Sequence, residues 1–375
     1  MTATISPLEL ASLVDQPGNA PFVLDVRAPD QFERWKIDGK AHPDGVNVPY
    51  WNALGDEEAT KAVIPRDQEV VVVCAHGGSS AMVVDTFGLP NLRNLAGGMD
   101  AWAVTLIPHA LSDDGSHLVV QFDRIAKACL SYAVGARGDA MAVIDPAAEI
   151  DAYLEMAREL DARITDVFDT HLHADHISKA RALCGATGAT YHIAPGDAEG
   201  ATFEYQPLRD GERFVIGDME IVVRSVATPG HTPGSTSLEV DGRYLMTGDA
   251  VFVTGIGRPD LGGETEPWAR DLFRTIHDRL APLDGELEVC PAHYTDRSEA
   301  GDDGTIRRRL ADLLANDPVV SMTDEDAFVR HVVDHLGTPP GVYQDIRKVN
   351  MGWLVVDGDQ AKVLEVGRNE CALSG

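Results

Sequence analysis

The chain has 375 residues, of which 44% are hydrophobic, so it is long enough to form more than one buried core. With 31 basic and 60 acidic side chains, its formal net charge is −29. This charge disfavours nucleic acid as a partner because phosphates would be repelled, although adaptation to high salt also explains the acidity. We expect no membrane partner, because no apolar run reaches the roughly 18 residues of a spanning helix. We expect a cytoplasmic protein, because no secretory leader pattern opens the sequence and the five cysteines form no CxxC pair.

Residues 1–110 are predicted to form a first, α/β domain. "SPLELASLV" predicts a capped helix, and "PFVLDV" (21–26) and "EVVVVC" (69–74) predict buried parallel strands. Cys74 ends the second of these strands, before a short loop and a helix that we expect to begin near Ser80. A thiol in this position meets backbone N–H groups at a helix N-terminus, which stabilises a sulfur anion. Cys74 is therefore a candidate catalytic residue.

The polar stretch "LSDDGS" (111–116) predicts a linker, and residues 117–320 are predicted to form a second domain. The strand candidates in that domain are "LVVQF", "DAMAVID", "ITDVFDT", "MEIVVRSVAT" and "SLEVDGRYLMTGD". Two helical patterns cover residues 149–162 and 267–280. The tail, residues 321–375, is predicted to contain a helix around "DEDAFVRHVVDHL" and then a short strand pair.

Histidines and aspartates gather where the strands of the second domain end. "THLHADHIS" (170–178) holds three histidines and one aspartate, and later segments add "TPGHTPGS", "YLMTGD" and "CPAHY". Imidazole and carboxylate groups are ligands for zinc, iron or manganese. Four such segments indicate a metal site rather than scattered surface histidines. The candidate ligands are His171, His173, Asp175, His176, His231, Asp249 and His293.

The order HxHxDH, GHTPGS, TGD and a late histidine resembles the metallo-β-lactamase fold family over about residues 117–320. This resemblance implies an αββα sandwich with the metal at one edge. "CAHGGSS", together with "LDVR" (24–27) and "LAGGMDAW" (95–102), resembles the rhodanese family. That second resemblance implies a parallel sheet flanked by helices, in which Cys74 accepts a sulfane sulfur and passes it on as a persulfide. A buried structural cysteine is the alternative, and only His76 could supply positive charge in this loop.

"GIGRPDL", "PAHY" and the tail "PPGVYQDIRKVNMG" resemble persulfide dioxygenases, with residues 321–375 as a C-terminal extension of that domain. The resemblance implies one Fe(II) per chain, held by His171, His231 and Asp249. It also implies a small-molecule thiol persulfide as substrate, with glutathione as the usual thiol, oxidised by O₂ to sulfite and the thiol. The remaining candidates would then surround the iron: His173, Asp175, His176 and His293.

All seven potential ligands of a two-metal site are nevertheless present in the sequence. Two Zn(II) ions in a glyoxalase II-like thioester hydrolase are therefore the alternative, because paired zinc ions activate water and offer no redox route. A non-catalytic sulfide sensor or sulfur-carrier adaptor is a third hypothesis. A homodimer is the common outcome for a soluble enzyme of this kind.

Arg258 and Tyr294 are candidate substrate-binding residues. Arg258 either pairs with a substrate carboxylate or braces the loop that carries Asp249. Tyr294 either donates a hydrogen bond at the metal or packs in the core. Arg347 and Lys348 either bind carboxylates of the thiol carrier or face solvent. Four cysteines have no motif context and are interpreted as structural: Cys129, Cys184, Cys290 and Cys371.

Overall fold

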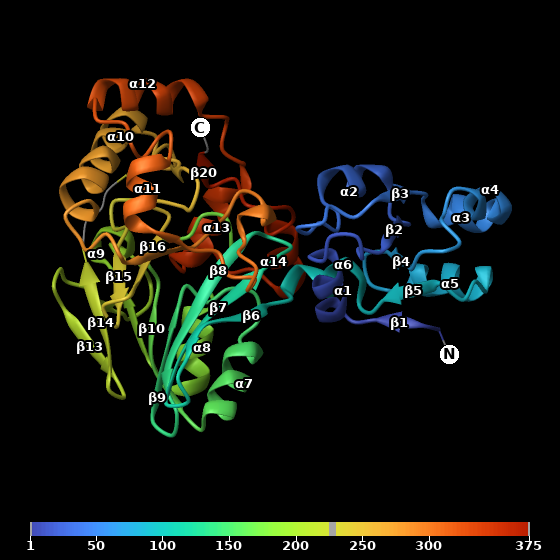
Figure 1. The fold of residues 1–375 in the computed structure, drawn as a ribbon, viewed down its shortest axis with the longest axis horizontal. Coiled ribbons are helices and arrows are strands. Elements are labelled where there is room, and N and C mark those ends of the chain that lie inside the picture. The colour runs from blue at the N-terminus through green and yellow to red at the C-terminus, as the bar shows by residue number, and fades with distance from the viewer. Residues whose placement is uncertain (1, 225–229, 374–375) are drawn as a thin grey trace. The chain divides into compact units, whose positions relative to one another are not determined.

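A computed structural model describes residues 2–224 and 230–373 of the chain, with its elements labelled in Figure 1. The chain divides into two compact units. The first consists of Met1–Ile107, Arg124–Lys127 and Val366–Arg368, and the second of Pro108–Asp123, Ala128–Glu365 and Asn369–Gly375. Residues 225–228, which end the strand predicted from "MEIVVRSVAT", lie outside the described residues.

The first unit contains a five-stranded sheet in the order β1-β5-β4-β2-β3, and every pair of neighbouring strands is parallel. Its strands are β1 (Thr4–Ile5), β2 (Phe22–Asp25), β3 (Gly45–Asn47), β4 (Val70–Val73) and β5 (Leu92–Leu95). The four valines of β4 are all buried, as expected for β-branched residues in a strand covered on both faces. The two predicted parallel strands are thus confirmed as β2 and β4.

Helices complete the first unit. They are α1 (Pro7–Val14), α2 (Pro29–Arg34), α3 (Tyr50–Gly55), α4 (Glu57–Ala62), α5 (Gly78–Phe87) and α6 (Gly98–Val104). Ser6 caps α1 by accepting a hydrogen bond from the Glu9 N–H, and Pro7 stands at the first helical position. Separate apolar clusters pack on the two faces of the sheet. A parallel sheet flanked by helices is the fold expected for residues 1–110.

Two sheets form the second unit. The first has the order β12-β11-β10-β9-β8-β7-β6, and the second the order β13-β14-β15-β16-β18-β19. The strands of the first sheet are β6 (Ile107–Asp113), β7 (His117–Arg124), β8 (Cys129–Ala136), β9 (Ala140–Ile144), β10 (Arg163–Phe168), β11 (Thr190–Ile193) and β12 (Gln206–Pro207). Those of the second are β13 (Arg213–Ile216), β14 (Met219–Arg224), β15 (Ser237–Val240), β16 (Tyr244–Gly248), β18 (Glu288–Pro291) and β19 (Arg308–Arg309). One core joins them, with Leu130 and Ile144 from the first sheet and Ile221 and Val240 from the second.

Helices cover the outer face of each sheet in the second unit, as Figure 1 shows. Next to the first sheet lie α7 (Asp151–Leu160) and α8 (Ala180–Thr187). Next to the second lie α10 (Thr265–Arg274), a π-helical segment (Thr275–Leu280), α11 (Leu310–Asn316) and α12 (Glu325–His335). The expected αββα sandwich is thereby confirmed. Other short elements are α9 (Pro195–Ala198), β17 (Ile256–Gly257), a 3₁₀ turn (Arg297–Glu299), α13 (Val342–Asn350), α14 (Gly358–Leu364) and β20 (Ala372–Leu373).

Two sequence predictions about connections are wrong. The stretch 111–116 is not a linker, because residues up to Asp113 belong to edge strand β6 and the rest form a turn into β7. The tail does not form a strand pair by itself. Asp357 and Gln360 make a capping box that begins helix α14, and β20 pairs antiparallel with the distant β17. Among the described residues, no helix has the length and apolar character needed to cross a membrane.

Candidate functional site

Two histidines and a carboxylate meet at one edge of the sandwich in the second unit. His171 follows β10, Asp249 follows β16, and His231 lies in the segment between β14 and β15. One Asp249 oxygen, Oδ2, lies 3.2 Å from Nε2 of His231 and 3.8 Å from Nε2 of His171. All three side chains are buried. The structure therefore brings together the three residues expected to hold the iron.

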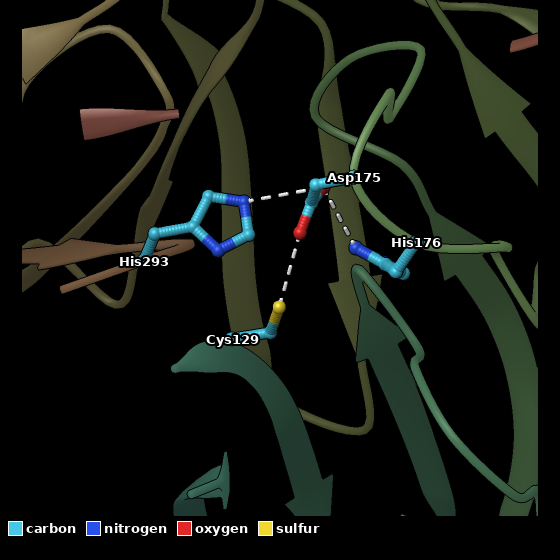
Figure 2. A group of neighbouring side chains, drawn as sticks. All are labelled: Cys129, Asp175, His176 and His293. Atoms are coloured by element: carbon cyan, nitrogen blue, oxygen red, sulfur yellow. Dashed lines mark hydrogen bonds and ion pairs between the residues drawn. The ribbon is translucent and has the colours of Figure 1, made fainter. Parts of the chain in front are cut away.

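A second group of donors lies on the other side of the same carboxylate. Oδ1 of Asp249 is 3.3 Å from Nε2 of His293, and this nitrogen is 3.6 Å from Oδ1 of Asp175. Asp175 also lies 3.1 Å from Nδ1 of His176 and accepts a hydrogen bond of 3.2 Å from the Cys129 thiol (Figure 2). Asp249 therefore faces both groups, one with each oxygen.

The hydrogen bonds of three histidines leave a lone pair directed into this site. Nδ1 of His231 donates to the carbonyl of Arg258 at 2.9 Å, and Nδ1 of His293 donates to the carbonyl of Ala128 at 3.3 Å. The hydroxyl of Thr170 donates to Asp145, so it accepts from Nδ1 of His171 at 3.0 Å. Each neutral ring then carries its lone pair on Nε2, as a metal-binding histidine requires.

These inward-facing atoms form a set that fits a metal ion. Among the residues that the structure describes, no hydrogen-bond partner reaches Nε2 of His171, His176, His231 or His293, or either oxygen of Asp249. Buried polar atoms without partners are rare, and each one costs free energy. A divalent cation would satisfy all of them at once, and imidazole with carboxylate suits zinc or iron.

Burial lowers the pKa values of three histidine donors, and this keeps their rings neutral, as metal binding requires. It lowers the pKa of His231 to about 3 and that of His293 to about 4, and it holds the pKa of His171 well below its ordinary value. These rings are therefore neutral at pH 7. Burial, together with the Asp175 charge, raises the pKa of Asp249. A bound cation would reverse that rise by stabilising the Asp249 anion.

His173 has a different setting from the other histidines. Its Nε2 donates to Asp145 at 3.2 Å and lies 3.8 Å from Asp169, whereas its Nδ1 has no partner among the described residues. Burial favours the neutral ring, but Asp145 and Asp169 outweigh that effect and raise the pKa of His173. The two carboxylates fix the orientation of this ring next to His171, with the ring centroids 4.2 Å apart.

Arg258 makes contacts within the protein that match the bracing role. Its guanidinium donates two hydrogen bonds to Asp260, one to the carbonyl of Glu370 and one to the carbonyl of Gly337. Its own carbonyl accepts from His231. Tyr294 is buried, and its hydroxyl donates to Asp123 at 3.1 Å. A contact of either side chain with substrate stays a prediction.

Two cysteines that the sequence pattern did not single out lie at this site. Cys129 begins β8 and forms an antiparallel bridge with His293. Cys371 comes from the last described residues of the chain and lies with Asp249 and His293 in one group of donor atoms, all within 4.8 Å of one another. Neither cysteine belongs to a motif, and Cys371 is more than 70 residues from every other donor along the chain, so only the fold reveals them.

In the first unit, Cys74 lies directly after β4 with its sulfur held by two donors. The N–H of Gly77 reaches Sγ at 3.1 Å and the hydroxyl of Ser80 reaches it at 3.0 Å. Gly98 has φ +62°, and a Cβ there would lie 2.3 Å from the Cys74 carbonyl, so this close loop packing requires glycine. His76 is exposed and pairs with Asp100 at 3.0 Å. The cradle expected for a sulfur anion is therefore formed by neutral donors.

Comparisons with known proteins agree with this architecture. Residues 124–293 match the Metallo-beta-lactamase superfamily, and residues 6–105 match the Rhodanese-like domain. The chain is 38% identical to a hydroxyacylglutathione hydrolase of Anaeromyxobacter dehalogenans, over 45% of this chain and 63% of that protein. It is 31% identical to the mitochondrial persulfide dioxygenase ETHE1 of Bos taurus, over 44% of this chain and 65% of that protein. Each match thus spans less than two thirds of the relative.

A third relative is matched over most of its length. The chain is 30% identical to the probable polyketide biosynthesis zinc-dependent hydrolase BaeB of Bacillus velezensis, over 53% of this chain and 84% of that protein. Among solved structures, ETHE1 from Myxococcus xanthus superposes with a TM-score of 0.53 at 29% identity, over 66% of this chain and 99% of that one. The chain therefore belongs to the metallo-beta-lactamase superfamily and carries a rhodanese-like domain at its N-terminus.

Proposed function

We propose that this protein is a persulfide dioxygenase with one Fe(II) at His171, His231 and Asp249, coupled to sulfur transfer through Cys74. The observation that carries the proposal is the set of two histidines and one carboxylate with inward-facing, unpartnered atoms. Such a set leaves coordination positions open, as in oxygen-activating non-haem iron enzymes. The similarity to ETHE1 in sequence and in fold supports the same activity.

Fe(II), when bound, supplies the redox chemistry that lets O₂ react with a sulfur anion. The protein's own residues orient the donors: Thr170 fixes His171, and the Arg258 carbonyl fixes His231. In the balanced reaction, R–SSH, O₂ and water yield R–SH and sulfite. Both atoms of O₂ bond to the outer sulfur, its bond to the thiol sulfur breaks, and water supplies the third oxygen of sulfite and the hydrogen of the released thiol. Burial of all three donors limits access of bulk water during this step.

A pocket beside the metal-binding loops supports a small thiol carrier as the substrate. Its volume is about 380 Å³, and Leu172 and Pro233, the neighbours of two donor segments, line it. Arg347 and Lys348 line it together with Asp197 and Glu199, and Lys348 also pairs with Asp345. A carrier such as glutathione has both carboxylates and an ammonium group, so a pocket lined by both signs of charge suits it. The volume lies within the range of pockets that bind small ligands. The identity of the thiol is part of the proposal.

The proposal is tested by O₂ uptake of anaerobically Fe(II)-loaded protein on addition of glutathione persulfide, with sulfite measured in the same sample. We expect uptake matched by sulfite, and loss of both in His231→Ala. His335→Ala, which changes an exposed histidine on α12, is the matched control and should keep full activity. Loaded protein that consumes no O₂ with glutathione persulfide or with other small-thiol persulfides would contradict the proposal.

A dizinc thioester hydrolase is the second candidate, because Asp249 faces two donor groups and could serve two ions. The similarity to a hydroxyacylglutathione hydrolase favours this alternative as well. Two zinc ions would activate water for attack on a thioester carbonyl. Rapid hydrolysis of a glutathione thioester by the zinc-loaded protein, together with no O₂ uptake by the iron-loaded protein, would establish it instead.

A further inference from the structure

The residues around Cys371 attach the end of the described chain to the metal-binding loops. Strand β20 pairs with β17, with Leu373 opposite Ile256 and Ala372 opposite Gly257. The Arg258 N–H donates to the carbonyl of Cys371 at 2.9 Å. Because the carbonyl of Arg258 in turn accepts from His231, one short backbone segment holds both a metal-binding histidine and Cys371.

The Cys371 sulfur is placed against donor atoms that lack partners. It lies with a carboxylate oxygen of Asp249 and a ring nitrogen of His293, all within 4.8 Å of one another. The two Asp249 oxygens and Nε2 of His293 are buried and have no hydrogen-bond partner in the described part of the chain. Metal donors stand about 2.0–2.3 Å from zinc, so the donors of one ion lie within roughly 4.6 Å of one another. The 4.8 Å limit on these three donors is close to this span, so the sulfur would need to approach by at most a few tenths of an ångström to share a cation with Asp249 and His293.

A buried cysteine often serves only as a small apolar side chain. Part of the surroundings of Cys371 fits that role, because Ala174, Ile177 and Leu261 belong to the same apolar cluster. The thiol also donates a long hydrogen bond of 3.9 Å to the hydroxyl of Tyr343, and its sulfur lies near a carboxylate and an imidazole that have no hydrogen-bond partner among the described residues. A cation bound to these atoms would satisfy them, and the Cys371 sulfur lies close enough to Asp249 and His293 to join them as a third donor.

We infer that Cys371 supplies a sulfur donor to a thiophilic divalent cation, such as zinc, ferrous iron or cobalt, bound at Asp249 and His293. Thiolate, imidazole and carboxylate together are a ligand set that such cations accept. This cation is a second ion beside the one that His171, His231 and Asp249 would hold, so the inference goes beyond the single Fe(II) of the proposed function.

The test uses the full chain reconstituted with Co(II) in buffer without added thiol, in a Cys74→Ser background that removes the sulfur of the first unit. A thiolate ligand gives a thiolate-to-cobalt charge-transfer band in the near ultraviolet. We expect this band in the background protein and its loss in Cys371→Ser. Cys290→Ser is the matched control, because Cys290 is equally buried but belongs to none of the donor groups found among the described residues.

The inference fails if the background protein shows no such band, or if the band persists in Cys371→Ser. It also fails if Cys129→Ser, which removes the thiol beside Asp175, abolishes the band while Cys371→Ser keeps it. Should Cys371→Ser not fold, X-ray absorption of the zinc-loaded Cys129→Ser protein in the same Cys74→Ser background replaces it. A sulfur neighbour at about 2.3 Å then supports the inference, and a shell of nitrogen and oxygen alone overturns it.

Discussion

Arg258 illustrates how much of the site depends on one side chain that is not itself a metal donor. Its guanidinium binds the Asp260 carboxylate through two hydrogen bonds of 2.7 and 2.8 Å, and both side chains are largely shielded from water. Bidentate arginine–carboxylate pairs are strong and fix geometry. Its bond to the carbonyl of Glu370 connects the pair to the segment that carries Cys371.

Arg258→Ala is expected to lower the free energy of unfolding by about 3 kcal/mol, because the largely shielded Asp260 carboxylate loses its partner. Urea unfolding with and without metal measures the change. The control is Arg213→Ala, which breaks an exposed pair with Glu220 and should cost at most about 1 kcal/mol. Equal losses in the two variants would contradict the bracing role.

At the scale of residues, the sequence reveals donors that lie in compact motifs at strand ends. His171, His231, Asp249 and His293 were found in this way, and the structure brings them together. Cys129 escaped because strand β8, which it begins, was not among the predicted strands. Cys371 lies in a segment without a recognisable pattern, and its position depends on a pairing across more than 100 residues.

At the scale of elements, β17 passes very close to the metal-binding segments. A Cβ at Gly257 would lie 1.9 Å from the carbonyl oxygen of Asp249 and 3.2 Å from Nδ1 of His231. Real side chains do not approach backbone atoms this closely, so the strand or the donor segments would have to shift. Glycine at this position allows β17 to hold β20 and His231 together.

Gly257→Ala is therefore expected to weaken metal binding by roughly 10- to 100-fold, the effect typical of changes that displace the partners of metal ligands. Competition with a chromogenic chelator measures the affinity. Gly185→Ala in α8 is the matched control, because a Cβ there meets nothing within 4 Å. Unchanged affinity in Gly257→Ala would show that the segment adapts without moving the donors.

The β6–β7 turn provides a pH-dependent contact. The Asp114 carboxylate accepts the N–H groups of Ser116 and His117 and also contacts the His117 ring. The bond from the His117 N–H, followed by that from its ring, lowers the pKa of Asp114 to about 2. Because the pKa of Asp114 is lower in the folded protein than in the unfolded chain, the Asp114 carboxylate stabilises the folded state above its ordinary pKa near 4. This stabilisation is lost as the pH falls towards 2.

NMR titration of the Asp114 carboxyl carbon should accordingly give a midpoint near 2. In Asp114→Asn, the stability deficit relative to the original protein should be present at neutral pH and shrink below about pH 4. A carboxyl midpoint near 4 would contradict the turn geometry.

The same turn shows why element boundaries were harder to predict than elements. Polar residues with a glycine suit a linker between domains and a tight turn between strands equally well, and only the pairing of β6 in its sheet distinguishes them. In the tail, the capping box at Asp357 favoured a helix where we expected strands. The long amphipathic patterns that became α7, α10 and α12 were predicted correctly because their periodicity extends over whole helices.

At the scale of the whole molecule, the two units contain separate sets of reactive groups. Cys74 and its cradle belong to the first unit, and the metal donors belong to the second. Because each set has its own core, damage to one is expected to leave the other folded. The sequence separated these two regions through their different motifs. It could not show that residues 124–127 and 366–368 group with the first unit, because non-contiguous packing has no local signature.

Cys74→Ala should therefore abolish sulfur transfer. The rate of persulfide oxidation by the iron-loaded protein should stay within about twofold, which corresponds to a change of about 0.4 kcal/mol in the activation barrier. Transfer to cyanide from a persulfide donor and O₂ uptake measure the two activities. Cys184→Ala, which removes a half-buried cysteine in α8, should preserve both. Equal loss of both activities in Cys74→Ala would reject this division of labour.

The wide separation of the donors along the chain determines when the metal site can exist during folding. Its members extend from Cys129 to Cys371 and come from both sheets and from the tail. Contacts between such distant segments form late, because long loops must close first. The metal ion then does not nucleate folding. It binds to the αββα sandwich after the sheets have formed, and stabilises it. Metal capture during refolding should consequently mark the last step, when β20 docks onto β17.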